Sequence, residues 1–176
     1  VDVDLMGPLE EDLLKTVYEM TVMESKCGWI EIVGLKDKSC ETVESQLDKV
    51  LTELTNNTNQ LRTDYSRLHS DQGGEFKGVF DRTVTSLNLT HTDTGGYNSC
   101  VNPVENAQGR LQQTARAMLA ACTGGHDYFR ELRGLSLKRA AYCINRKGQV
   151  EKSGSQNLSK PSPYELAWGK AYDWND

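Results

Sequence analysis

Three acidic residues, Asp4, Asp71 and Glu105, are the residue types that a metal-dependent reaction would use. Mg²⁺ prefers oxygen ligands, binds a few carboxylates, and completes its coordination with water and substrate phosphate. Two such ions about 3.5–4 Å apart can activate a hydroxyl group, stabilise a leaving oxygen and screen the phosphorus oxygens. If the three acids converge, they could therefore support attack on a phosphodiester. They stand in the local sequences DVDLMGP, RLHSDQGGEF and GYNSCVNPVENAQGR.

Taken singly, each acid also has an ordinary structural explanation. Asp4 could be a solubilising charge on a strand, and Asp71 could be a turn residue before Gln-Gly-Gly. Glu105 could be an acid in the first turn of a helix, where the helix dipole favours negative charge. The chemical interpretation therefore depends on the three acids occurring together, each in its own motif.

The elements around the acids can be predicted from hydrophobic periodicity. In VDVDL, Val1, Val3 and Leu5 would face one side of a strand, with Asp2 and Asp4 on the other. Further strands are predicted at 16–23 and 29–35, which together with the first make an antiparallel meander, and at 65–70 and 87–92. Helices are predicted from Ser39 onward, after Gly74, from Pro103 to Gly124, over 128–146 and over 163–168.

The side chains predicted to face the core come from several of these elements. Phe129, Leu132, Leu135 and Tyr142 would point inward from the helix over 128–146. The predicted core also contains four aromatic residues: Trp29, Phe76, Phe80 and Trp168. The segment 147–160 is rich in Gly, Ser and charged residues, which predicts a mobile linker. The order of strands and helices suits a mixed sheet with helices on both sides.

Taken together, the motifs resemble the catalytic core of retroviral-type integrases, most closely those of copia-type retrotransposons. In that family the first acid precedes a short apolar stretch and Gly-Pro, as Asp4 precedes Leu5 to Pro8. The second lies in a motif like H-S-D-x-G-G-E-F, which residues 69–76 match here, and the third lies in the first turn of a helix. AAYCINR at 140–146 and SPYELAWGK at 162–170 extend the likeness almost from end to end.

The resemblance implies a ribonuclease H-like α/β fold, with a mixed five-stranded sheet flanked by helices. Residues 1–146 would form the catalytic core, and 147–176 a mobile linker and C-terminal helical segment. Asp4, Asp71 and Glu105 would bind two Mg²⁺ or Mn²⁺ ions for 3′-end processing and strand transfer of DNA. The expected partners are element-end DNA, target DNA and further copies of the chain, acting in the nucleus after a cytoplasmic particle stage.

The chain departs from the family pattern in two places. Only 33 residues separate Asp71 from Glu105, two fewer than is usual in that family. The stretch between Asn102 and the glutamate is also one residue shorter than in the family pattern. Asn102 could help to position water or a DNA end, or could simply cap the helix. Gln112 and Arg116 share the helix face of Glu105 and are the candidate DNA contacts there, but only Arg116 is basic.

Overall composition narrows the possibilities further. The length of 176 residues suits one domain, and no apolar run approaches the roughly 20 residues needed to cross a bilayer. The five cysteines are odd in number and form no C-x-x-C pair, which favours a reducing compartment. A net charge of −5 predicts weak DNA binding by this core alone. Two alternatives to an integrase stay open. One is a ribonuclease H-like nuclease, and the other is a catalytically silent interaction or DNA-binding module, which the shortened spacing and the single basic residue beside Glu105 would suit.

Overall fold

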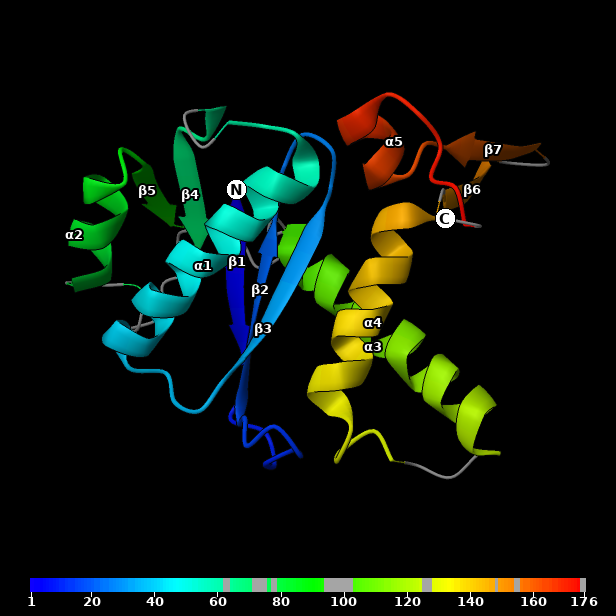
Figure 1. The fold of residues 1–176 in the computed structure, drawn as a ribbon, viewed down its shortest axis with the longest axis horizontal. Coiled ribbons are helices and arrows are strands. Elements are labelled where there is room, and N and C mark those ends of the chain that lie inside the picture. The colour runs from blue at the N-terminus through cyan, green and yellow to red at the C-terminus, as the bar shows by residue number, and fades with distance from the viewer. Residues whose placement is uncertain are drawn as a thin grey trace.

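A computed structural model describes residues 1–61, 64–70, 76, 79–93, 103–124, 128–147, 149–153 and 156–174. Along the chain, three strands are followed by a helix, a strand, a helix, a strand and two helices, as the periodicity predicts, and then by a hairpin and a short helix (Figure 1). Within the described ranges the strands are β1 (Asp2–Met6), β2 (Tyr18–Met23), β3 (Ile30–Leu35), β4 (Arg67–Ser70), β5 (Thr90–Asp93), β6 (Gln149–Ser153) and β7 (Gln156–Lys160). The helices are α1 (Cys40–Thr58), α2 (Val79–Ser86), α3 (Pro103–Thr123), α4 (Arg133–Arg146) and α5 (Pro163–Trp168).

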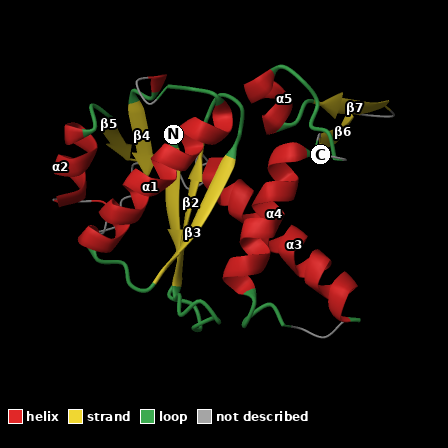
Figure 2. Ribbon diagram, viewed as in Figure 1, coloured by secondary structure: helices red, strands yellow, loops and turns green. Residues whose placement is uncertain are grey.

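The first five strands form one mixed sheet in the order β3-β2-β1-β4-β5 (Figure 2). β1, β2 and β3 are antiparallel neighbours, whereas β4 runs parallel to β1 and β5 runs parallel to β4. The predicted antiparallel meander is thus confirmed, and so is the mixed five-stranded sheet. β1 stands at the centre, where both of its edges are hydrogen-bonded.

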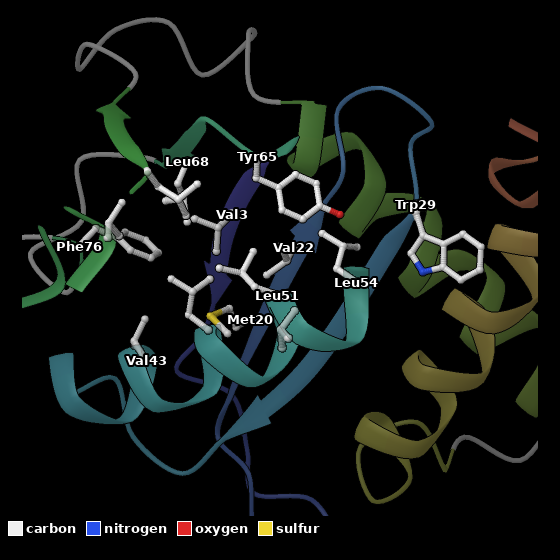
Figure 3. Packing of buried hydrophobic residues seen from close by; sticks show 14 of the residues in the cluster. Val3, Met20, Val22, Trp29, Val43, Leu51, Leu54, Tyr65, Leu68 and Phe76 are labelled. Atoms are coloured by element: carbon white, nitrogen blue, oxygen red, sulfur yellow. The ribbon is translucent and has the colours of Figure 1, made fainter. Parts of the chain in front are cut away.

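Each face of the sheet has its own hydrophobic cluster. Val3, Met20 and Val22 point to the face covered by α1, where Val43, Leu51 and Leu54 pack against them (Figure 3). On the other face, Met23, Ile30 and Ile32 pack against residues of α3 and α4. The buried residues of these two helices in that cluster are Val104, Ala107, Leu111, Ala115, Leu137, Ala140 and Ala141.

Local sequence signals fix the ends of several helices. Ser39 caps α1 by accepting a hydrogen bond from the Thr42 backbone N–H, and Asn59 ends the helix in the left-handed conformation. Gly124 has a φ of +63° just after α3, which confirms the stop predicted there. Ser162 and Glu165 form a reciprocal capping box at the start of α5, the helix predicted over 163–168.

The prediction for α4 is wrong in its start and in the inward direction of Leu135, whereas Phe129 is buried as predicted. The helix begins at Arg133 rather than at 128, and Leu135 is 50% exposed, whereas Leu137 is fully buried. Its orientation is set by polar contacts: Arg133 is buried, and the Gly134 N–H donates to the Asp12 carboxylate at 3.0 Å. A Cβ on Gly134 would lie 2.8 Å from the Asp12 oxygen, so this close approach requires glycine.

The polar segment after α4, for which the composition predicts a mobile linker, contains the antiparallel hairpin of β6 and β7. Beyond it, α5 packs on α1 and α4, and Trp168 donates from its indole Nε1 to the Asn57 carbonyl at 3.0 Å. Trp168 is 39% exposed, so assigning it to the core was wrong. Trp29 and Phe76 are buried as predicted, and the Phe80 side chain lies outside the described part.

The outer edge of β3 is partly closed by a side chain of α4. The Ile30 N–H donates to Asn145 Oδ1 at 2.9 Å, and Asn145 Nδ2 donates to the Ile30 carbonyl at 2.7 Å. One buried amide therefore replaces the backbone partner that a further strand would supply. This contact ties the helix to the sheet on the side where α3 also packs.

Candidate active site

Asp4 lies in the central strand, on the face of the sheet that α3 covers. Val3 is fully buried on the α1 face, so the alternation of the strand turns Asp4 and Met6 to the opposite one. Met6 packs against the cluster of α3 and α4. Asp4 itself is half-buried, and its Oδ1 accepts the Leu5 backbone N–H at 2.9 Å. The side predicted for this acid is confirmed.

Glu105 is exposed in the first turn of α3, between the buried anchors Val104 and Ala107. Two turns further along the face of α3 that carries Glu105, Gln112 Nε2 contacts the Met6 sulfur at 2.6 Å. Since Met6 shares the strand face of Asp4, α3 runs across the face that carries this acid, as Figure 1 shows behind the sheet. The negative charge of Glu105 also matches the positive end of the helix dipole.

The strand that precedes the second acid is the parallel neighbour of β1. Asp2 pairs with His69 in the register, and the Val1 carbonyl accepts the His69 N–H at 2.8 Å. Asp71 directly follows β4 in the sequence but lies outside the described residues, as does Asn102. Two of the three predicted acids are thus described, and they stand on elements that pack together.

Within the part of the chain that the structure describes, no group of three His, Cys, Asp or Glu side chains is close enough to hold a metal ion. That part includes Asp4 and Glu105 and omits Asp71. The oxygen donors of these two carboxylates are the kind that Mg²⁺ and Mn²⁺ accept. The donor chemistry therefore fits a hard divalent cation.

Comparison with known proteins gives the fold. No protein-family model matches the chain, and neither does any curated protein sequence. Among solved structures, the catalytic core domain of BIV integrase superimposes with a TM-score of 0.60 at 19% identity, over 96% of this chain and 93% of that one. A chain in the structure of a simian T-cell lymphotropic virus intasome in complex with the PP2A regulatory subunit B56 gamma gives a TM-score of 0.65 at 16% identity, over 95% of this chain and 54% of that one.

This chain has the fold of an integrase catalytic core. The ribonuclease H-like mixed sheet with flanking helices, predicted from the motifs, is therefore confirmed. At these identities the likeness establishes the fold alone, and the catalytic assignment must come from the residues. The two acids described here stand on the central strand and on the long helix of this integrase-type core.

The two predicted DNA contacts on α3 already have partners within the core. Gln112 is half-buried against Met6. The guanidinium of Arg116 is exposed but lies 4.1 Å from the centre of the Phe129 ring. This stacked pair lines a cavity of about 240 Å³ together with Leu9, Glu10, Arg130 and Arg133. A DNA strand would have to share or displace these contacts.

Three arginines of α4 are also engaged within the protein. Arg146 stacks on Tyr142 at 3.8 Å and on Tyr172 at 5.0 Å, and Arg139 lies over Tyr142 at 4.8 Å. Arg133 is buried and donates to Glu19 and to two backbone carbonyls. These three arginines therefore stabilise the packing of α4.

A hydrogen-bonded chain of three side chains, not anticipated from the sequence, spans the other edge of the sheet. Ser70 Oγ lies 2.7 Å from His91 Nε2, and His91 Nδ1 is hydrogen-bonded to Asp81 Oδ1. These residues come from β4, β5 and α2. Because 10 or more residues separate each from the next, periodicity and local motifs could not have found it.

A second cavity, of about 200 Å³, lies between β3, α1 and α4 and is lined by a half-buried carboxylate. Glu31 Oε1 accepts hydrogen bonds from Trp29 Nε1 at 2.8 Å and from Asn57 Nδ2 at 2.7 Å. Burial raises the pKa of Glu31 above its ordinary 4.5, although these two hydrogen bonds act to lower it. Ionisation of this acid is therefore costly in the folded state.

The raised pKa predicts a pH-dependent effect of Glu31→Gln. A carboxyl group with a raised folded pKa contributes stability below its unfolded value of 4.5, and this contribution is lost as the pH rises through the folded value. Glutamine keeps the acceptor oxygen without the charge. The variant should match the parent near pH 4 and become the more stable of the two toward pH 8, as measured by urea midpoints.

Glu53→Gln is the matched control, because Glu53 is an exposed acid beside the same cavity. Its urea midpoint should stay close to that of the parent throughout this range, as is usual for surface substitutions. A Glu31→Gln variant that loses stability relative to the parent as the pH rises would contradict the prediction.

Among the described residues, no helix is long and apolar enough to span a bilayer. Cys27, Cys122 and Cys143 are free thiols in the described part of the chain. Burial raises the pKa of the Cys27 thiol to about 12, so this group is an unreactive part of the core.

Proposed function

We propose that this chain is the catalytic core of a copia-type retrotransposon integrase, which processes DNA 3′ ends and transfers them to target DNA. The observation that carries the proposal is the arrangement of β1, β4 and α3. Asp4 is on the central strand, Glu105 opens the helix across the same face, and Asp71 directly follows the parallel neighbour of β1. The motifs around the three acids support the same assignment.

The strand register adds support for convergence of the first two acids. Asp2 and His69 are paired in the parallel strands β1 and β4, and Asp4 and Asp71 each come two residues later in the sequence. Residues two apart in extended backbone share a face, so an extended backbone from His69 to Asp71 would put Asp71 on the same side as Asp4. Glu105 would then complete the set from α3.

Three carboxylates suit two Mg²⁺ or Mn²⁺ ions, which when bound activate the nucleophile and stabilise the leaving oxygen of a phosphodiester. Asp4 and Asp71 would contribute ligands to both ions, and Glu105 to one. Asn102, Gln112 and Arg116 would orient DNA beside Glu105. Since an integration reaction joins two DNA ends to one target, we also expect the core to act as a homo-oligomer.

The direct test uses labelled duplex DNA with a free 3′ hydroxyl, supercoiled plasmid as target, and Mn²⁺. The chain should join the two covalently, and Asp71→Asn should abolish joining while leaving the circular dichroism spectrum unchanged. Full activity of Asp71→Asn would refute the assignment. Hydrolysis of DNA without joining would favour the ribonuclease H-like nuclease instead.

A catalytically silent module is the second candidate, and one observation favours it. The guanidinium groups of Arg116, Arg133 and Arg146 are used in contacts within the chain, which leaves fewer cations for phosphate. Calorimetric titration with Mn²⁺ separates the two candidates. Binding of two ions that is lost in Glu105→Gln supports catalysis, whereas a parent chain that binds no Mn²⁺ supports the silent module.

A further inference from the structure

The Ser70–His91–Asp81 chain joins three separate elements at one edge of the sheet. Ser70 is the last residue of β4, His91 lies in β5, and Asp81 is in the first turn of α2. Ser70 is fully buried, the His91 side chain is 16% exposed, and the Asp81 side chain is 50% exposed. The chain thus runs from the interior of the sheet to solvent.

The direction of its hydrogen bonds follows from the chemistry of the groups. An ionised carboxylate only accepts, so His91 donates from Nδ1 to Asp81, and Nε2 is left as the acceptor. The Ser70 hydroxyl then donates to Nε2 at 2.7 Å. This order resembles that of a serine nucleophile with its base, but a hydroxyl with no solvent exposure cannot be reached by a substrate.

The Ser70–His91–Asp81 hydrogen-bonded chain lies on the opposite face of the sheet from the proposed active site. Leu68 and Ser70 are both fully buried on the α1 face, and alternation turns His69 to the face of Asp2 and Asp4. His69 has its own cross-strand contact there, with Thr92 Oγ1 at 2.9 Å. The two faces of the strand end are therefore held by separate hydrogen bonds.

We propose that the Ser70–His91–Asp81 chain is a positioning clamp for the proposed active site. Segment 71–78, which begins with Asp71, connects Ser70 at the end of β4 to α2. By connecting Ser70 to Asp81 through His91, the clamp holds together the two elements that flank this segment, β4 and α2. This inference rests on the proposed function, because it assigns the clamp to the elements that present one of the three carboxylates.

Supporting hydrogen bonds of this kind have measurable effects on metal sites. Replacing residues that orient a metal ligand typically costs about 10–100-fold in metal affinity or activity. Asp81 is the member best suited to a test, since half of its side chain is exposed and its replacement opens no cavity. Asp81→Asn removes the charge that holds the His91 tautomer, whereas Asp81→Glu keeps a carboxylate.

The experiment measures Mn²⁺-dependent DNA joining, with the maximal rate and the half-saturating Mn²⁺ concentration determined separately, beside thermal unfolding. Asp81→Asn should lower the rate or raise the half-saturating concentration by about 10–100-fold, with little change in the unfolding midpoint. Asp81→Glu should recover most of the loss. Glu11→Gln is the control, because Glu11 is 54% exposed and pairs only with Lys15 among the described residues.

Each outcome decides the question. If the parent is active and Asp81→Asn behaves like Glu11→Gln, the clamp is wrong and the proposed function stands. If the activity of Asp81→Asn falls only in proportion to its folded fraction, the three hydrogen-bonded side chains serve stability alone and the clamp is again wrong. A parent that neither joins DNA nor binds Mn²⁺ overturns the proposed function, and the clamp with it. Labelling of Ser70 by a fluorophosphonate would show an accessible nucleophile and overturn the positioning role alone.

Discussion

The Glu105→Gln variant is expected to lose at least about 10³-fold of its Mg²⁺- or Mn²⁺-dependent strand transfer while folding as the parent does. Charge stabilisation by bound metal ions supplies several kcal/mol of the barrier reduction, and each 1.36 kcal/mol is tenfold in rate. Glutamine has nearly the same shape but is a far weaker ligand. Because Glu105 is exposed, its loss leaves no unpaired buried group. Joined product per unit time is the measurement.

Glu41→Gln is the matched control for this variant. Glu41 is also an exposed acid in the first turn of a long helix, and it belongs to α1. Both substitutions remove the same favourable interaction with a helix dipole, so both should shift stability by about 0.3–1 kcal/mol. Only the α3 variant should lose activity. Equal activities of the two variants would mean that Glu105 has no role beyond its helix.

The parts of the fold that were predictable have strong local signals. Alternation in VDVDL fixed the faces of β1, and Ser162, Pro163 and Glu165 marked the start of α5. Two of the three proposed catalytic acids could be assigned to elements for the same reason. The position of Asp71 and Asn102 stays a prediction, because both lie outside the described residues.

The errors came where contacts between distant residues overrode local pattern. Periodicity favoured an inward Leu135, but the hydrogen bonds of Arg133 and Gly134 to the segment after β1 turn the helix so that Leu137 is inward. The composition of 147–160 gave no strand pattern, yet β6 and β7 pair with each other. Similarly, no local signal connects Ser70 to His91 and Asp81, which meet only once β4, β5 and α2 have assembled.

Arg133→Met is expected to be the most destabilising substitution of a single charged residue, at about 3–5 kcal/mol. Arg133 donates from Nε to Glu19 at 3.1 Å, and from its Nη atoms to the carbonyls of Glu10 at 2.6 Å and Thr16 at 2.8 Å. Methionine fills much of the same space but leaves the Glu19 charge and both carbonyls without this donor. For a chain of this length, the unfolding midpoint should fall by roughly 6–20 °C.

Arg130→Met provides the comparison, since Arg130 is 63% exposed and its ion pairs with Glu10 and Glu131 are on the surface. Such pairs contribute about 0–1 kcal/mol, so this variant should unfold within a few degrees of the parent. The double variant Arg133→Met/Glu19→Met should be more stable than Arg133→Met alone, because it no longer buries an unpaired carboxylate. Similar midpoints for Arg133→Met and Arg130→Met would show that the buried network is unimportant.

The two acids around Arg133 also determine how its contribution varies with pH. Burial raises the pKa of Glu19 even though Arg133 acts to lower it, so removing the arginine raises this pKa further. Because the pKa of Glu19 is raised in the folded state, this group contributes stability below the ordinary value of 4.5, and the contribution is lost as the pH rises.

Burial also acts to raise the pKa of Asp12, but hydrogen bonds from Thr16 and Gly134 hold it below its ordinary 3.8. Its contribution is therefore lost only in more acidic solution. The deficit of Arg133→Met relative to the parent should consequently grow from pH 4.5 toward pH 8, and a deficit that shrinks over this range would refute the assigned role of Glu19.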